Sequence, residues 1–201
     1  RRDSIMAYKQ HFIEWFSGKS LPSYWDTEVS GTYTMVNEVD GGLKVTCANS
    51  GNANGRIHFG DKRQFDLTSS KFNSVAKKVD LDGTRTFYIG LSHHNVIGVD
   101  ANNNYGFHYH APNVSVYLNA RSGDGSSTTN TSTGITMDKN FHALSAESTG
   151  TNTLHYVDGV LRVTNTATLP TGNGQPSFVT GQNNSGQTGS AQIRFYEAYN
   201  T

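Results

Sequence analysis

The chain has 201 residues and equal numbers of basic and acidic side chains, 16 of each. This balance gives no electrostatic basis for binding nucleic acid or an anionic membrane, and we expect neither partner. Hydrophobic residues make up 34% of the chain and there are 21 glycines, which is typical of short strands joined by many turns. The 11% of aromatic residues can build a sizeable core, so general disorder is excluded.

Cys47 is the only cysteine, which excludes a disulfide framework and a thiolate zinc site. It ends the segment LKVTC, where alternation places Leu43, Val45 and Cys47 on one side of a strand, so we expect a small buried side chain. No apolar run approaches the ~20 residues of a membrane span, and no signal-peptide pattern is present.

Residues 1–16 form an apolar N-terminal segment with two alternative structures. Ile5, Tyr8, Phe12 and Trp15 fall at near-helical spacing, which favours a short helix, but the segment could also be an arm that leads into the first strand. These four side chains must be buried somewhere. They pack either on the domain itself or on a neighbouring subunit, where they would be assembly contacts.

The middle of the chain alternates as short strands do. Residues 72–81 place Phe72, Ser74 and Ala76 on one side, and residues 85–91 do the same with apolar side chains. Residues 92–104 and 120–134 are polar and carry no strand signal, so we predict loops there. Further strands are expected at 31–39, 43–47, 56–59, 105–110, 114–119, 177–179 and 191–198.

Residues 139–170 give the clearest pattern, three consecutive antiparallel strands. Asp158-Gly159 separates the β-prone runs 153–157 and 160–166. An Asp-Gly pair in this position predicts a tight hairpin, because a type I′ turn needs positive φ at both central residues.

The F-H-x-L strand, the Y-V-D-G-V-L hairpin and the closing L-P of this segment resemble the core of laminin-G-like and concanavalin-A-like jelly rolls. The resemblance implies an all-β, antiparallel jelly-roll β-sandwich over residues 17–201, preceded by the short arm or helix at 1–16. The superfamily hosts lectins, glycan-binding modules, glucanases and virion proteins, so the fold alone does not fix the function.

Hydrolytic members of the superfamily carry E-x-D-x-x-E on one strand, which presents two carboxylates on one face as acid and nucleophile. The chain has no such run, and its glutamates are isolated from one another. We therefore predict that the protein is not an enzyme.

Sugar binding needs flat aromatic faces and side chains that exchange hydrogen bonds with hydroxyls. Alternation along 105–110 assigns Tyr105, Phe107 and Tyr109 to the core, because they are the apolar set. The opposite face then carries the candidate glycan-binding residues, and His93 and His94 could fold back from the preceding loop to join them. The candidates are His108, His110, Tyr117, Asn119, His93 and His94.

No cofactor is required by this pattern, but Ca²⁺ is a predicted optional ligand. The loop that begins at Asp100 resembles an EF-hand, yet it lacks the glycine and the glutamate that the motif needs. Asp100 and Asn102 are the expected calcium ligands. His108 and His110 could also share one ion, although solvated polar side chains are the favoured interpretation.

These observations predict a non-enzymatic virion surface structural protein, such as a capsid decoration, fibre or spike protein, that attaches to cell-surface glycans. It would be extracellular or on the virion surface, and its partners would be other structural subunits or copies of itself. The alternative is a carbohydrate-binding, lectin-like module of a secreted or cell-surface protein.

Overall fold

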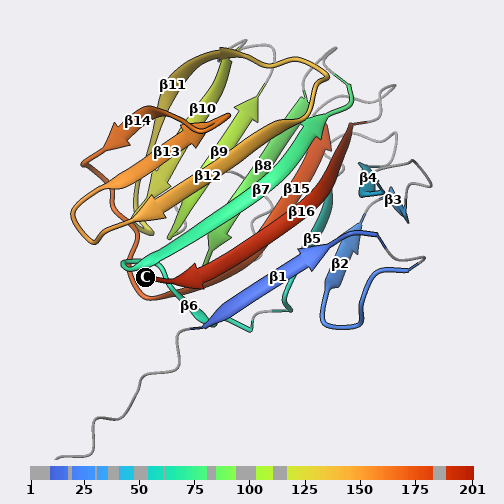
Figure 1. The fold of residues 1–201 in the computed structure, drawn as a ribbon, viewed down its shortest axis with the longest axis horizontal. Helices are drawn as coiled ribbons and strands as arrows, with labels where there is room; N and C mark the ends of the chain where they lie inside the picture. Colours follow the sequence, from blue (N-terminus) through green and yellow to red (C-terminus); the bar gives the residue numbers. More distant parts are fainter. Residues whose placement is uncertain are drawn as a thin grey trace, which may run out of the picture.

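The computed structural model arranges the chain as two antiparallel β-sheets packed face to face (Figure 1). It describes residues 10–17, 20–29, 31–35, 41–47, 54–60, 62–80, 85–93, 103–110, 117–182 and 189–201. All the regular elements among them are strands, which confirms the predicted all-β antiparallel sandwich. A membrane-spanning helix is absent from the described residues.

Sheet A is built around the long strands β7 and β16, which lie side by side (Figure 1). β1 pairs with β16 outside the main strand order. In spatial order the sheet contains β14 (Val160–Asn165), β13 (Thr153–Val157), β12 (His142–Ser148), β7 (Ser70–Lys78), β16 (Ser190–Asn200), β4 (Leu43–Cys47) and β3 (Gly31–Met35), with β1 at His11–Trp15.

Sheet B is the second layer, and a run of consecutive strands from β8 to β11 forms one side of it. The short strand β6 pairs with β15 outside the main order. In spatial order the sheet contains β11 (Thr128–Thr136), β10 (Tyr117–Gly123), β9 (Asn104–His110), β8 (Arg85–Ser92), β15 (Asn173–Gln182), β5 (Asn54–His58) and β2 (Asp26–Val29), with β6 at Phe65–Asp66.

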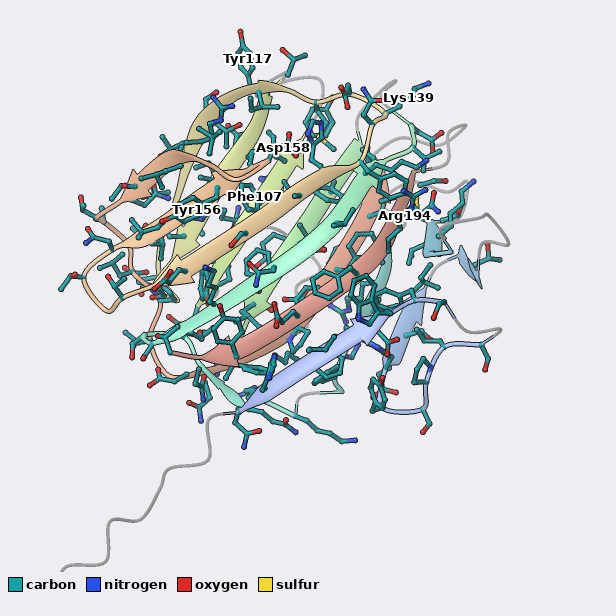
Figure 2. The ribbon with its side chains drawn as sticks, viewed as in Figure 1. Phe107, Tyr117, Lys139, Tyr156, Asp158 and Arg194 are labelled. Carbon is teal, nitrogen blue, oxygen red and sulfur yellow. The ribbon has the colours of Figure 1, made fainter. Side chains whose placement is uncertain are left out.

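The core lies between the sheets and is rich in aromatic rings. Phe72 of sheet A stacks on Tyr196 at 5.8 Å between ring centroids, and Phe107 of sheet B lies edge-on to His155 at 5.4 Å (Figure 2). The Tyr196 hydroxyl donates a 2.7 Å hydrogen bond across the sandwich to the Gly90 carbonyl. The two layers are thus joined by ring packing and by a polar link that satisfies a buried hydroxyl.

The predicted hairpin is confirmed. β13 and β14 flank Asp158 and Gly159, whose φ angles are +52° and +78° as a type I′ turn requires. The inward positions predicted for Cys47 and for Phe72 are also correct, since both side chains are buried.

One local prediction is wrong. The region 120–134 is not a loop, because β10 continues to Gly123 and β11 begins at Thr128. β11 is an edge strand with the sequence TTNTSTGIT, which has almost no apolar side chains. It therefore lacks the hydrophobic alternation from which a strand is predicted. Of the two alternatives for the N-terminal segment, its described part agrees with the arm that leads into the first strand, because His11–Trp15 is strand β1 and pairs with β16.

Candidate functional site

The outer face of sheet B gathers polar side chains from five adjacent strands. In one row, Ser177 of β15 pairs with His58 of β5 on one side and with Gly90 of β8 on the other. The next row brings Tyr88, His108 and Asn119 together. We call this surface the polar face; its members are Arg56, His58, Tyr88, Asn104, His108, Asn119, Arg121, Gln175 and Ser177, all buried.

Two glycines let backbone and side chain approach closely at the centre of this face. Gly90 and Gly106 are paired across β8 and β9. A Cβ atom on Gly90 would lie 2.2 Å from the Tyr105 carbonyl oxygen and 2.8 Å from the Tyr88 hydroxyl. The Tyr88 side chain therefore occupies space that any larger residue at position 90 would take.

The Tyr88 hydroxyl is a hydrogen-bond donor in this structure. It lies 3.1 Å from the Leu91 carbonyl and 3.2 Å from the Tyr105 carbonyl. Burial raises the pKa of Tyr88 well above its usual value, and the charge of nearby Arg121 lowers it only in part. Tyr88 thus stays protonated and orients the centre of the polar face.

Arg121 places a positive charge inside the same face. Its side chain is 2% exposed, and its Nε donates to the Asn104 amide oxygen at 3.2 Å. Its Nη1 donates to the Asn130 amide oxygen at 3.4 Å. These amide partners fix the guanidinium without neutralising its charge.

The other end of the polar face is anchored by backbone amides. His58 Nδ1 accepts a hydrogen bond from the Gly60 amide at 2.9 Å, so the ring proton of neutral His58 lies on Nε2. The Gln175 Oε1 accepts from the Phe59 amide at 3.0 Å. Both side chains are therefore held in fixed orientations.

Carboxylates are few in the strands of this sheet; apart from Asp66 of β6, they lie on the edge strand β2. The strands β5, β8, β9, β10, β11 and β15 contain no aspartate or glutamate. β2 supplies two, since Asp26 pairs with His58 and Glu28 pairs with Arg56. Asp26 is exposed, so it is available to a ligand that lies along the edge of the polar face.

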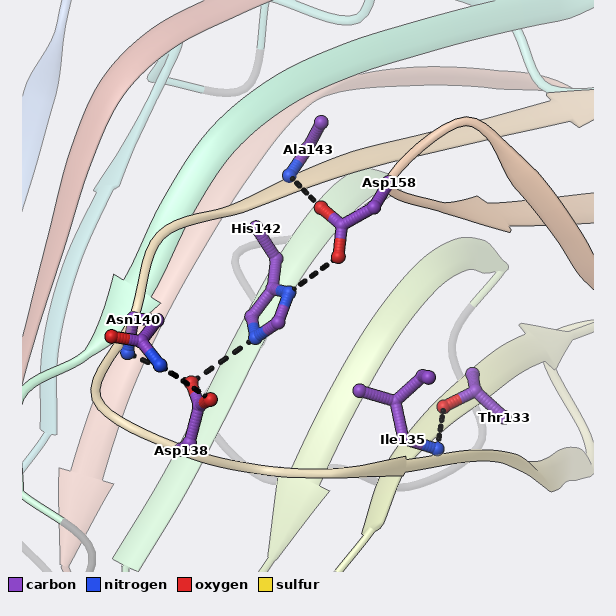
Figure 3. Close-up of polar contacts among 7 residues, drawn as sticks. All are labelled: Thr133, Ile135, Asp138, Asn140, His142, Ala143 and Asp158. Atoms are coloured by element: carbon purple, nitrogen blue, oxygen red, sulfur yellow. Dashed lines mark hydrogen bonds and ion pairs between the residues drawn. The ribbon is translucent and has the colours of Figure 1, made fainter.

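A second polar cluster lies at the start of β12 in sheet A (Figure 3). His142 Nδ1 is 2.8 Å from Asp158 Oδ2, and His142 Nε2 is 3.1 Å from Asp138 Oδ1. The other Asp158 oxygen accepts from the Ala143 amide at 2.9 Å. The cluster thereby ties the hairpin turn to β12 and to the segment before it.

The carboxylates in this cluster stabilise the protonated form of His142, and His142 helps to stabilise the Asp138 carboxylate. Burial opposes the charged form of His142, but the hydrogen bonds and negative charges of Asp158 and Asp138 outweigh it and raise its pKa. Burial also disfavours the Asp138 carboxylate, but hydrogen bonds from Asn140 and His142 lower its pKa overall. Among the residues that the structure describes, no three histidine, cysteine or acidic side chains form a metal-binding group.

The predicted glycan-binding residues are only partly brought together. His108 and Asn119 are neighbours on the polar face, but they are 5% and 7% exposed, so the expectation that they are exposed is wrong. Tyr117 is 41% exposed at the rim (Figure 2). His110 pairs with Thr86 on the same sheet.

His93 lies apart from these residues. Its Nδ1 is 2.9 Å from the Asn173 carbonyl oxygen, and its Nε2 is 2.9 Å from Arg63 Nη1. The predicted residue His94 and the predicted calcium ligands Asp100 and Asn102 lie outside the described residues.

The structure describes two of the four predicted assembly contacts, Phe12 and Trp15. Phe12 packs on its own domain, with ring centroids 4.6 Å from Phe59 and 5.7 Å from Trp25. Trp15 is 65% exposed beside Phe195, while Ile5 and Tyr8 lie outside the described residues. The packing alternative thus accounts for Phe12, and Trp15 stays a predicted contact.

Several members of the polar face were not found from the sequence. Alternation within residues 85–91 could have identified Tyr88, because it lies opposite the apolar set. Arg121 gives no such signal, because it lies within residues 120–134, where hydrophobic alternation is absent. Gln175 and Ser177 were missed because β15 reaches β8 and β5 across long stretches of sequence, and pairing at that distance leaves no local signal.

No family model matches the sequence, and no curated protein matches it either. Solved structures do share the fold. A glycoside hydrolase family 16 endo-glucanase from Bacteroides ovatus has a TM-score of 0.66 and 15% identity, over 92% of this chain and 98% of that one. A Bacillus licheniformis β-glucanase has a TM-score of 0.67 and 12% identity, over 95% and 98%.

A β-1,3-glucanase from Mycobacterium marinum also has a TM-score of 0.67, with 12% identity over 93% of this chain and 97% of that one. The concanavalin-A-like jelly roll implied by the sequence resemblance is therefore the fold of this chain. The expectation of a non-enzymatic virion surface protein is wrong on this comparison, since these neighbours are glucan-cleaving enzymes and not virion proteins.

Proposed function

We propose that the protein is a carbohydrate-active enzyme that binds a polysaccharide across the polar face of sheet B. The main support for this proposal is the polar face, in which hydroxyl, amide, imidazole and guanidinium groups from five strands are held in fixed orientations. Such groups exchange hydrogen bonds with sugar hydroxyls, and Tyr117 at the rim offers a flat ring for stacking.

The proposed substrates are β-glucans, because the structural neighbours with this fold are named glucanases. A polysaccharide is too large to enter a closed site, so we propose that it lies along the outer surface of sheet B, where Asp26 and Tyr117 are exposed. We expect the protein to meet this polymer outside the cell.

The catalytic carboxylates are proposed to come from β2. Glycoside hydrolysis requires an acid and a base or nucleophile, usually two carboxylates. Asp26 and Glu28 occupy alternate positions of one strand, which are about 7 Å apart along it. Alternate positions of a strand face the same side of the sheet, and His58, which pairs with Asp26, can orient the Asp26 carboxylate.

The test is to incubate the protein with mixed-linkage and β-1,3-glucans and to measure new reducing ends. We expect Asp26→Asn to lower the rate by at least about a hundredfold with an unchanged melting temperature, because a general acid or base contributes ~10²–10⁴-fold. The matched control is Asp124→Asn, since Asp124 is an exposed carboxylate in the turn between β10 and β11 and should leave the rate unchanged. Absence of cleavage by the wild-type protein would contradict the proposal.

A further inference from the structure

The outer face of sheet A contains a groove of about 410 Å³, on the opposite side of the sandwich from the polar face. It crosses β16, β7, β12 and β13, and Phe195 and Tyr156 line it from the two outer strands. Figure 2 shows Tyr156 on the left-hand part of this sheet. The size of the groove falls within the ~300–1,000 Å³ of small-molecule sites.

Strand register explains how the groove forms. Phe195 pairs with Val75, and Val75 pairs with Ala143, so a ring is followed by two smaller side chains. In the next row Tyr156 pairs with Ser145. Three strand spacings separate β16 from β13, so the backbones that carry the two rings are about 14 Å apart.

The ends of the groove are kept open by the backbone. Gly159 of the hairpin turn lines one end, and a Cβ atom there would meet nothing within 4 Å. At the other side a β-bulge between Ile193 and Phe195 turns Arg194 away, and its guanidinium lies 3.7 Å from the Phe141 ring centroid. Arg194 therefore packs on Phe141 and is not among the residues that line the groove.

Polar side chains follow the floor between the two rings. The Asn73 amide donates to Glu197 Oε2 at 2.7 Å, which orients its own oxygen. The Lys71 ammonium lies 3.8 Å from Glu147 Oε2 and 6.0 Å from the Tyr156 ring centroid. The groove thus offers hydrogen-bond donors and acceptors beside aromatic faces.

The aromatic surface continues beyond the groove. Trp15 of β1 pairs with Phe195, and their ring centroids are 4.5 Å apart. Since Trp15 is largely exposed, a chain that occupies the groove can extend onto it. The surface therefore has the length to take a linear polymer, not only one ring.

We propose that this groove is a second glycan-binding site, which holds a polysaccharide chain by stacking sugar rings on Tyr156 and Phe195. The apolar faces of pyranose rings fit aromatic walls, and their hydroxyls fit Asn73, Ser145 and Lys71. The site is independent of the chemistry at the polar face. It would keep the polymer attached while another part of that polymer occupies sheet B.

The experiment uses native affinity electrophoresis in gels that contain mixed-linkage β-glucan, β-1,3-glucan or xylan. We expect Tyr156→Ala and Phe195→Ala each to weaken retention at least about tenfold in at least one gel. Leu161→Ala is the matched control, because Leu161 is an exposed apolar residue opposite Tyr156 that does not line the groove. Circular dichroism melts identify any variant that fails to fold, and Tyr156→Phe, which keeps the ring, should retain binding.

The outcomes separate this site from the proposed catalytic one. Asp26→Asn should lose cleavage and keep retention, while Tyr156→Ala should keep cleavage of short soluble oligosaccharides. Retention that is equal for wild type, Tyr156→Ala and Phe195→Ala would overturn the second site, as would no retention in any gel. Sedimentation analysis that shows a dimer broken by Phe195→Ala, with glucan retention unchanged, would assign the groove to a second copy of the chain instead.

Discussion

The outer faces of the two sheets cover the same core and are built in opposite ways. On sheet A, burial alternates along β7, β12 and β13, so every second side chain is partly exposed. On sheet B, the described side chains of β8 and β9 are buried on both faces, and those of β10 are buried except for Tyr117. Polarity still alternates on both sheets.

The difference teaches that a polar side chain opposite the core is not necessarily in contact with solvent. On sheet A, the small outward side chains of Val75 and Ala143 leave a groove between larger neighbours. On sheet B the outward residues include Tyr88 and Arg121, which pack on glycines and amides of neighbouring strands. The polar face is thus a packed layer whose geometry is fixed before any ligand arrives.

Gly90→Ala should give the largest effect, because it tests the packed layer directly. The new methyl group would lie 2.2 Å from a backbone oxygen, which cannot move without breaking the pairing of β8 and β9. We expect a loss of about 3–5 kcal/mol in the free energy of unfolding, measured by urea denaturation. Ser145→Ala on the open face of sheet A is the control and should change it by less than about 0.5 kcal/mol. Equal losses would mean that the two faces do not differ in packing.

Arg121→Leu should cost somewhat less, about 2–4 kcal/mol, since it removes buried hydrogen bonds to Asn104 and Asn130. The comparison is Lys71→Ala, which removes a partly exposed cation from sheet A. Such surface pairs contribute ~0–1 kcal/mol, so the melting temperature should hardly move. A Lys71 variant that loses as much as the Arg121 variant would contradict the contrast between the faces.

Gly159→Val tests the turn that leaves the groove open. A β-branched residue is strained at a φ of +78°, so we expect a loss of about 1–3 kcal/mol. Gly159→Asn is the matched variant, because asparagine adopts positive φ more readily. Both can be compared by thermal melts, in which 1 kcal/mol shifts a domain of this size by roughly 2–4 °C. If valine and asparagine behave alike, backbone strain is not the cause.

The smallest expected effect is a pH dependence of stability, which should come from the His142 cluster at the start of β12 in sheet A. The pKa of His142 is raised above 6.5, so its contribution to stability is complete below 6.5 and is lost as pH rises through the folded pKa. The pKa of Asp138 is lowered below 3.8, so its contribution is present above 3.8 and is lost as pH falls through the folded value. Stabilisation by this cluster is therefore greatest between pH 3.8 and 6.5.

The measurement is the melting temperature of wild type and of His142→Gln at pH values inside this window and on both sides of it. Their difference should be largest in the window and should shrink as pH rises above it. A constant difference at all pH values would show that His142 contributes by packing and not by charge.

The predictable parts of the fold were those with local causes. Asp158-Gly159 specifies its turn by backbone conformation, and Phe72, Ser74 and Ala76 specify a buried face by alternation. β11 could not be predicted because Thr128–Thr136 is a polar edge strand that owes its structure to pairing with β10.

The candidate site followed the same rule. Alternation placed His108 and Asn119 on one face of neighbouring strands, which the register confirms. Their burial was not predictable, because it arises from side chains such as Arg121 that only pairing between strands brings near. His58 and Ser177 are neighbours across 119 positions of sequence, and no local pattern encodes that.

The position of β16 has a consequence for synthesis of the chain. This strand follows all the others in the chain, yet it pairs with β7, β4 and β1, three strands that leave the ribosome much earlier. Until β16 emerges, those strands have unpaired edges that can recruit other chains. Domains in which strands pair across long stretches of sequence fold slowly. The nascent chain is therefore most prone to aggregate before β16 has joined β7, β4 and β1 in sheet A. Loss of β16 alone should therefore turn a stable protein into one that aggregates.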